Sequence, residues 1–128
     1  MNTKEPKVLN MTAHPICIYA DEQIEDLKAR KLHLIDEACT PEKVYEASGL
    51  LATADRREYD GGIFDFTFEY SNVSELPNGY DYYIVSKMYL DACVALGRDT
   101  SKLRTIYGAV TDKATEKVVL GCRRLCKP

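Results

Sequence analysis

Two adjacent pairs of arginines are the residues in this chain best suited to specific binding chemistry. Arg56-Arg57 follows a predicted strand, and Arg123-Arg124 follows the last predicted strand. A further basic residue, Arg104, lies where the chain enters another strand. The guanidinium group is planar and offers paired N–H donors that match the oxygens of a phosphate. These positions indicate a phosphate-binding site at strand ends, unless the arginines serve only to solubilise the surface.

Aromatic, hydroxyl and imidazole groups extend this candidate site. Among nine tyrosines, Tyr82 and Tyr107 are candidates for stacking on a nucleotide base. Ser86 stands at a predicted helix start, where its hydroxyl caps the helix and the free N–H groups of the first turn attract phosphate. His14, beside a predicted strand, is either a hydrogen-bonded structural residue or a ligand contact. The complete candidate set is Arg57, Arg104, Arg56, Arg123, Tyr82, Tyr107, Ser86 and His14.

The familiar catalytic motifs are absent from the sequence. There is no phosphate-cradling Gly-x-x-x-x-Gly-Lys loop, Gly-x-Gly-x-x-Gly turn, Gly-x-Ser-x-Gly elbow or His-Glu-x-x-His pair. A nucleophilic pair of His14 with a thiol is chemically conceivable, and so is acid–base work by the carboxylates Asp55, Glu58 and Asp60. No spacing favours either arrangement. We therefore expect a protein that is not an enzyme, with no catalytic residues.

Five cysteines, an odd number, occur mostly in apolar contexts, and this predicts buried thiols rather than disulfides. Cys122 and Cys126 resemble half of a zinc clip. A structural zinc ion takes four ligands, however, and only the two histidines, His14 and His33, are available elsewhere. The sequence predicts no metal site and no cofactor.

The composition fits one globular domain spanning residues 1–128. The chain has 17 Lys plus Arg against 20 Asp plus Glu, and its net charge of -3 argues against binding to duplex nucleic acid or to anionic lipid. Its apolar runs are far shorter than the roughly 20 residues that span a bilayer. Its first residues are polar and lack the apolar core of an export signal. We expect a cytoplasmic protein that binds neither membranes nor duplex nucleic acid.

Hydrophobic patterning predicts an α+β fold, mainly antiparallel β-sheet with one principal helix at about residues 86–97 packed on it. The helix begins at the N-cap Ser86, ends at Gly97 and is apolar over most of its circumference, so it needs cover from the sheet or from a second subunit. The charged stretch 21–31 predicts a short surface helix or an excursion. Strands are expected at residues 7–12, 16–19, 32–35, 50–54, 63–70, 80–85, 105–110 and 117–122.

The clearest predicted strand is residues 63–70, in which aromatic and polar side chains alternate. An aromatic row with this period is typical of a core face, and the alternative is a base-stacking surface. The turn signal at residues 76–79 then predicts a hairpin-like return of the chain into strand 80–85. The aromatic row consists of Phe64, Phe66, Phe68 and Tyr70.

Several short motifs follow one another in a characteristic order along the chain. They are Asn10-Met-Thr-Ala-His14-Pro-Ile, Ser48-Gly49-Leu50, Leu76-Pro, Tyr83-Ile-Val-Ser86, Leu96-Gly-Arg-Asp99-Thr-Ser and Val119-Leu-Gly-Cys122. From Val8 to Leu125 this order resembles a group of small bacteriophage-type proteins whose starts read Asn-Leu-Thr-Pro-His and whose ends read Gly-Cys-x-x-Leu. Within that group the chain is similar to the first type of Thoeris anti-defence protein, a phage-encoded sponge. Ala13 stands where the group has proline, which leaves the first turn and the role of His14 open.

The resemblance implies a protein that binds its ligand without cleaving it. Members of this family sequester glycocyclic ADP-ribose isomers made by TIR-domain immune enzymes, and some also sequester cyclic oligonucleotides. They do so in pockets between the subunits of a homo-oligomer built from dimers, up to a hexamer. The chain would then act in the host cytoplasm, with arginines on the pyrophosphate and a tyrosine on the adenine.

Two other function classes are compatible with the same residues. One is a small nucleotide-processing enzyme that uses His14 with a carboxylate or a thiol. The other is a phage protein-interaction module, in which the aromatic face or the apolar helix binds a partner chain. Recovery of an intact ligand would favour the sponge, and recovery of a cleaved ligand would favour the enzyme. The absence of any nucleotide binding would favour the interaction module.

Overall fold

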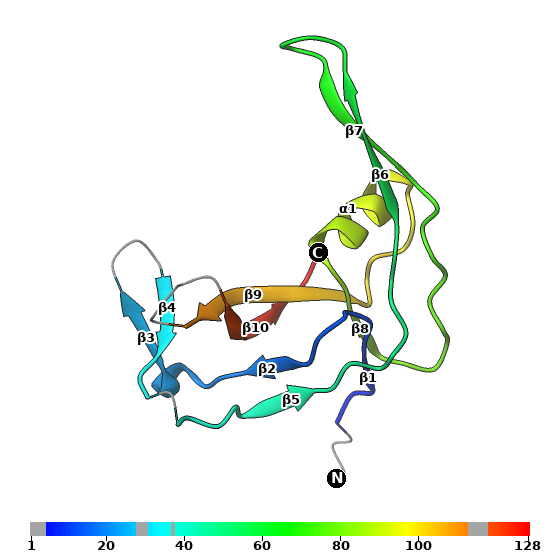
Figure 1. Cartoon of the computed structure of the whole chain (residues 1–128). Coiled ribbons are helices and arrows are strands. Elements are labelled where there is room, and N and C mark those ends of the chain that lie inside the picture. Colours follow the sequence, from blue (N-terminus) through cyan, green and yellow to red (C-terminus); the bar gives the residue numbers. More distant parts are fainter. Residues whose placement is uncertain (1–4, 28–30, 37, 113–117) are drawn as a thin grey trace.

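The computed structural model describes residues 5–27, 31–36, 38–112 and 118–128 as a body of short strands with one α-helix and one projecting arm (Figure 1). The helical elements are the 3-10 turn η1 (Asp21–Gln23) and the helix α1 (Lys87–Ala95). The strands are β1 (Val8–Asn10), β2 (Ile16–Ile18), β3 (Ile24–Leu27), β4 (Lys31–Leu34), β5 (Lys43–Tyr45), β6 (Asp55–Asp60), β7 (Phe66–Ser71), β8 (Tyr82–Ile84), β9 (Leu103–Thr111) and β10 (Val119–Cys126). This composition confirms the predicted α+β class with one principal helix.

The strands of the body form a mixed sheet rather than a purely antiparallel one. Their order is β1-β8-β9-β10-β2-β5. β9 with β10 and β2 with β5 are antiparallel pairs, whereas β1 with β8, β8 with β9 and β10 with β2 are parallel. The antiparallel pair β3–β4 attaches through a parallel contact of β4 with β9. Apolar patterning reveals a strand but not the direction of its neighbour, so the parallel pairs could not be predicted.

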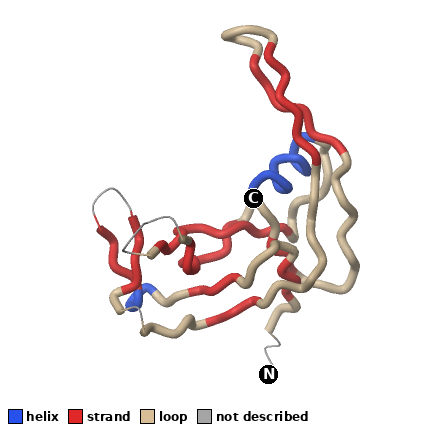
Figure 2. The backbone as a smooth tube through the Cα atoms, in the orientation of Figure 1, coloured by secondary structure: helices blue, strands red, loops and turns tan. Residues whose placement is uncertain are grey.

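The two ends of this strand order approach each other. Asn10, the last residue of β1, forms a β-bridge with Ala47, which follows β5. Backbone hydrogen bonds from Ser48 N to the carbonyl of Asn10 and from Ala52 N to the carbonyl of Met11, both 3.1 Å, extend the contact. Figure 2 shows β9 and β10 above β2 and β5, with the two levels joining near β1. The body is therefore a sheet wrapped back on itself, which reduces its free edges.

Strands β10 and β2 approach so closely that one position on β10 has no room for a side chain. A Cβ atom at Gly121 would lie 2.4 Å from the carbonyl oxygen of Cys17 and 2.6 Å from the ring of Tyr19. Gly121 is not among the glycines with positive φ, so glycine is required here for space and not for conformation. Its lack of a side chain allows the parallel pairing of Cys122 with Ile18.

Replacing Gly121 with alanine is expected to destabilise the fold by about 3 kcal/mol, because the added methyl group must displace backbone as well as a tyrosine ring. Urea unfolding followed by circular dichroism measures this change. Gly49→Ala is the matched control: a Cβ at Gly49 meets nothing within 4 Å, so only its φ of +84° carries a cost, about 1 kcal/mol. A Gly121→Ala variant as stable as the wild type would contradict the close approach of the two strands.

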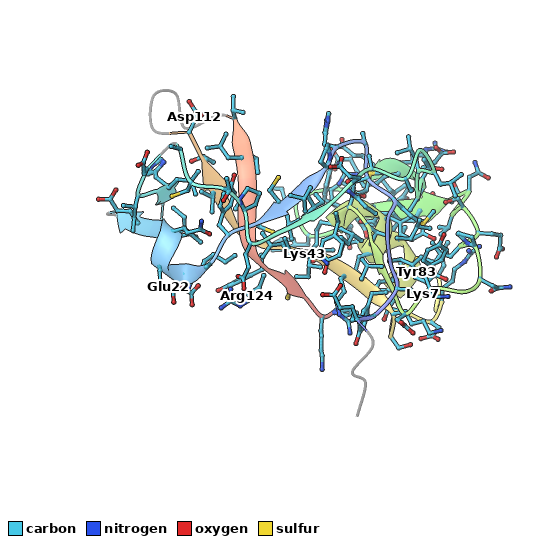
Figure 3. All side chains as sticks on the ribbon, turned by 90° about the horizontal axis from the view of Figure 1, so that it is seen from below. Lys7, Glu22, Lys43, Tyr83, Asp112 and Arg124 are labelled. Carbon is cyan, nitrogen blue, oxygen red and sulfur yellow. The ribbon has the colours of Figure 1, made fainter. Side chains whose placement is uncertain are left out.

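Two groups of buried apolar side chains form the core. The larger includes one face of α1 together with β1, β8 and the segments beside the arm, and the smaller includes parts of β4 and β9. Figure 3 shows the body from below, with Lys7 and Tyr83 toward one end and Glu22 and Asp112 at the other. The larger group comprises Leu9, Met11, Ala54, Val73, Tyr83, Val85, Tyr89, Leu90, Ala92, Cys93 and Leu103, and the smaller comprises Tyr19, Leu32, Leu34 and Val110.

The helix α1 confirms its sequence prediction. The N-cap Ser86 accepts the N–H of Tyr89 through Oγ at 3.1 Å, and Gly97 follows the helix with a φ of +69°. Tyr89 lies on the buried face, where its hydroxyl donates to the carbonyl of Ser74 at 2.7 Å. Burial raises the pKa of Tyr89 to about 12. Val94, on the opposite side, is 61% exposed, so the body covers only part of the apolar helix surface.

The pKa of Tyr89 predicts a loss of stability at alkaline pH. A tyrosine whose folded-state pKa lies above its usual value of 10.0 holds its proton more tightly in the folded protein, so stability falls as pH rises from about 10 to about 12. Tyr89→Phe removes this dependence, and at neutral pH it costs about 1 kcal/mol through the lost hydrogen bond to Ser74. Thermal melting from neutral to alkaline pH measures both effects. An unchanged alkaline slope in Tyr89→Phe would contradict the assignment.

A two-stranded arm projects from the body beyond α1 (Figure 1). It consists of the antiparallel pair β6–β7, with Asp60 opposite Phe66, and it forms a separate sheet. The prediction that its aromatic row is a core face is wrong, because Phe64 is 95%, Phe66 50% and Phe68 39% exposed. Alternation shows that one face of a strand is apolar, but it does not show whether anything in the same chain covers that face.

Other segments also differ from the prediction. The partner of β7 is β6 and not residues 80–85, because the chain reverses earlier, at Gly61-Gly62, where Asp65 N donates to the carbonyl of Gly62 at 3.1 Å. Residues 50–54 form no strand. The stretch 21–27 forms η1 and β3 instead of a helix, and residues 28–30 of that prediction lie outside the described part of the chain, as does Lys117 of the last predicted strand. No helix among the described residues is long and apolar enough to cross a bilayer.

Candidate functional site

A hollow of about 560 Å³ opens where the wrapped sheet meets the start of α1. This volume is in the range of small-molecule sites. Four segments line the hollow: the loop from β1 into β2, the junction of β8 and α1, the start of β9, and the first half of β10. The lining residues are Thr12, His14, Pro15, Ile16, Cys17, Val85, Ser86, Lys87, Thr105, Ile106, Val119, Leu120, Gly121 and Cys122. Most of this wall is apolar, and the polar groups are few.

The start of α1 supplies the polar end of the hollow. Ser86 Oγ already accepts the Tyr89 N–H, but its hydroxyl proton remains available to donate. Lys87 follows at the first helical position, where backbone N–H groups have no acceptor within the helix. Its Nζ contacts Asp91 at 2.5 Å, and this hydrogen bond, with the charge of the carboxylate, raises the pKa of Lys87 above its usual value. The described lining residues include no Asp or Glu, so the hollow is suited to an anionic group.

The side chain of Asn10 holds the loop that forms one wall of the hollow. Asn10 is only 2% exposed, yet every polar atom of its side-chain amide has a hydrogen-bond partner. Nδ2 donates to the carbonyls of His14 and Tyr45, both at 2.9 Å. Oδ1 accepts from the backbone N of Thr12 at 3.0 Å and from its hydroxyl at 2.6 Å. One side chain thus ties β1, the loop before β2 and the end of β5 together.

Asn10→Ala is expected to destabilise the protein by about 3 kcal/mol, because several buried polar groups lose their partner at once. Thr12→Val is the matched control, since it removes the hydroxyl contact to Asn10 and retains the Thr12 backbone bond, and it should cost about 1 kcal/mol. Chemical denaturation measures both, and amide hydrogen exchange of residues 12–18 should rise only in Asn10→Ala. Equal costs for the two variants would mean that the amide does not hold this loop.

Two thiols lie in the wall of the same hollow as His14. Cys17 is partly buried and Cys122 is fully buried, and both are free. Burial raises the pKa of the Cys122 thiol, which keeps it protonated and poorly nucleophilic at neutral pH. Cys122 is therefore not an activated nucleophile. No group of three His, Cys, Asp or Glu among the described residues is arranged to hold a metal ion.

The eight residues predicted for the site do not gather in one place. His14 and Ser86 both line the hollow. Arg104 stacks on the ring of Tyr82, with its guanidinium carbon 4.5 Å from the ring centroid, and donates to the carbonyls of Ser101 and Leu103 at 3.0 and 2.7 Å. Arg104 lines a separate depression near the C-terminus, and Tyr82 does not line the hollow either.

Arg123 lies within β10 rather than beyond its end, and it has a carboxylate partner. Its guanidinium contacts Asp21 Oδ1 at 3.2 Å, while Arg124 contacts Oδ2 of the same residue at 3.1 Å. Figure 3 shows Arg124 on the side of the body where η1 and its Glu22 lie. Tyr107 is opposite Arg124 in the β9–β10 pair and is 60% exposed. This cluster is a surface ion-pair network beside an exposed tyrosine.

Arg56 and Arg57 lie inside β6, on the arm, and point to opposite faces of it. Arg56 stacks on Phe68, with 4.5 Å between the guanidinium carbon and the ring centroid, and Arg57 stands opposite Glu69.

Lys87 lines the hollow but is not among the site residues predicted from the sequence. The available signal was its position directly after the predicted N-cap Ser86, where a basic side chain and free helix N–H groups coincide.

Comparison with known proteins gives no match: no family model fits the chain, and neither a curated protein nor a solved structure matches it.

Proposed function

We propose that the protein binds a small cyclic nucleotide and sequesters it without cleaving it. The observation that carries the proposal is the hollow of about 560 Å³ in which Ser86, Lys87 and His14 form a polar end against an apolar wall. A nucleotide combines a charged phosphate with flat, weakly polar rings, and such a site offers a matching part for each. The motif resemblance to the first type of Thoeris anti-defence protein supports the same ligand class, with glycocyclic ADP-ribose isomers first and cyclic oligonucleotides second.

In this proposal each part of the hollow has a defined task. The ammonium group of Lys87 and the first N–H groups of α1 bind a phosphate, to which the Ser86 hydroxyl also donates. The apolar residues of β2, β9 and β10 pack against the base and exclude water from it. His14, which lines the same hollow, also contacts the ligand. The protein acts in the cytoplasm of a host cell, where holding the signal intact is enough to silence a response.

The predicted arginines have a secondary role in this proposal. Arg104 with Tyr82, and Arg57 on the arm, lie away from the hollow of their own chain, so they contribute only if a second copy brings them to a ligand. Arg123 is engaged by Asp21 and Arg56 by Phe68 in the single chain. Lys87 is itself paired with Asp91, but it lines the hollow, and for that reason we rank it above these arginines as the first phosphate contact.

A second candidate function is a nucleotide-processing enzyme. Cys17 and His14 line the same hollow, and a thiol with an imidazole is the pair of groups that such an enzyme can use. Two observations favour the sponge over this enzyme. The other thiol in the hollow, Cys122, is held protonated by burial, and the described lining residues offer no carboxylate to orient the imidazole.

The proposal predicts stoichiometric binding of a glycocyclic ADP-ribose produced by a TIR-domain enzyme. Isothermal titration calorimetry should show that Lys87→Ala weakens binding at least 10-fold, since a lost charged hydrogen bond costs about 1.5 to 3 kcal/mol. Lys43→Ala is the matched control, because Lys43 also has a carboxylate partner, Glu5 at 3.1 Å, but does not line the hollow. Its affinity should equal that of the wild type.

The state of the ligand after release separates the remaining possibilities. The bound molecule is released by heat and its mass is measured. An intact molecule is the expected result, and a cleaved one would establish the enzyme instead. Equal affinity in Lys87→Ala and the wild type would overturn the placement of the site, whereas absence of binding to every cyclic nucleotide tested would overturn the sponge itself.

A further inference from the structure

The arm carries a continuous row of uncovered apolar side chains. Phe66 and Phe68 are 50% and 39% exposed on one face of β7, and at the tip Ile63 and Phe64 are each 95% exposed. At about 200 Å² per ring, the three phenylalanines alone leave roughly 350 Å² accessible. A contiguous patch of that size on a soluble protein marks an interaction surface. An isolated two-stranded hairpin is also only marginally stable in water, so the arm needs a cover.

The charged side chains beside the aromatic row indicate which partner covers this face of the arm. Opposite residues of an antiparallel pair share a face, so the side chains of Arg56, Glu58 and Asp60 flank the aromatic row. The basic group lies toward the body and the two acidic groups toward the tip. A face that is positive at one end, negative at the other and apolar between is complementary to itself when turned end for end.

We propose that the arm packs face to face and antiparallel against the arm of a second copy of this chain, around a two-fold axis. Each Arg56 then lies over the acidic half, Glu58 and Asp60, of the opposite arm, and the two phenylalanine rows pack against each other. In the single chain Arg56 stacks on Phe68, so on pairing its side chain turns from that ring to the opposite arm. The backbone of the arm stays as it is, because its tip is already held by hydrogen bonds from Gly62 N to Asp60 Oδ1 and from Gly61 N to the carbonyl of Asp65.

The area available agrees with a stable pair. A standard interface takes about 800 Å² from each partner. The three phenylalanines provide nearly half of this, and Ile63 adds to it at the tip. In the antiparallel arrangement each tip overhangs the base of the opposite arm, which is preceded by Leu50 and Leu51, each 52% exposed. The arm face and its base together therefore supply an interface of ordinary size.

This pairing is independent of the ligand proposed for the hollow. None of the residues that carry it lines the hollow, so a dimer without nucleotide binding, or the reverse, would distinguish the two proposals.

The first test places one substitution on each face of the same strand. The molar mass of the full chain, measured by light scattering after size-exclusion chromatography, is expected to be that of a dimer. Phe68→Glu should give a monomer, because it places a charge in the centre of the apolar row. Thr67→Glu introduces the same side chain on the opposite face and should leave the dimer intact. A monomeric wild type, or a dimer that survives Phe68→Glu with unchanged affinity, would overturn the proposal.

A second test uses charge exchange between the two arms. Arg56→Asp and the double variant Glu58→Arg/Asp60→Arg should each be monomeric alone, since like charges meet across the axis. Mixed in equal amounts they should form a heterodimer, because every contact across the axis then joins opposite charges. Local damage to an arm cannot produce this recovery. If the mixture stays monomeric by light scattering, the antiparallel arrangement is wrong.

Discussion

The fold depends on the hydrogen bonds of one buried side-chain amide, that of Asn10. Asn10 closes the wrapped sheet by linking the end of β1 to the end of β5 and to the loop that leads into β2. A polar group in this position is tolerated only because each of its donors and acceptors is used. Its partners are three backbone groups and one hydroxyl from two separate segments, the loop before β2 and the end of β5. The amide therefore specifies the positions of these segments relative to β1 in a way that apolar contacts, which lack direction, do not. The wall of the hollow is a direct product of that arrangement.

The extent to which the sequence predicts the structure varies with the range of the interactions involved. The helix from Ser86 to Gly97 is defined by local chemistry, namely a cap, an apolar face and a positive-φ glycine, and it was predicted closely. The aromatic row around Phe68 was recognised as an apolar strand face, but its exposure depends on what lies opposite in three dimensions. Pairings such as β1 with β8 depend on which distant strands meet, and no local pattern encodes that.

The candidate site shows the same distinction at the level of single residues. His14 and Ser86 were identified from the chemistry of their positions, and the fold brings them to one hollow although they are far apart in the chain. The charge of Arg104 predicts a phosphate contact, yet its guanidinium stacks on Tyr82, and neither residue lines the hollow. Arg123 is matched by Asp21 from a different segment. Residue type indicates what a side chain can bind, whereas its actual partner is a tertiary property.

The parallel pairing of β1 with β8 has a consequence for the order in which the chain folds. Lys7 and Asp81, which join their backbones at one end of that pair, are 74 residues apart. Closing so long a loop is entropically costly, and a chain dominated by such contacts folds slowly. The arm, in contrast, pairs only neighbouring residues and can form early in synthesis. During translation the whole arm is therefore synthesised before β8, β9 and β10, the strands that complete the body.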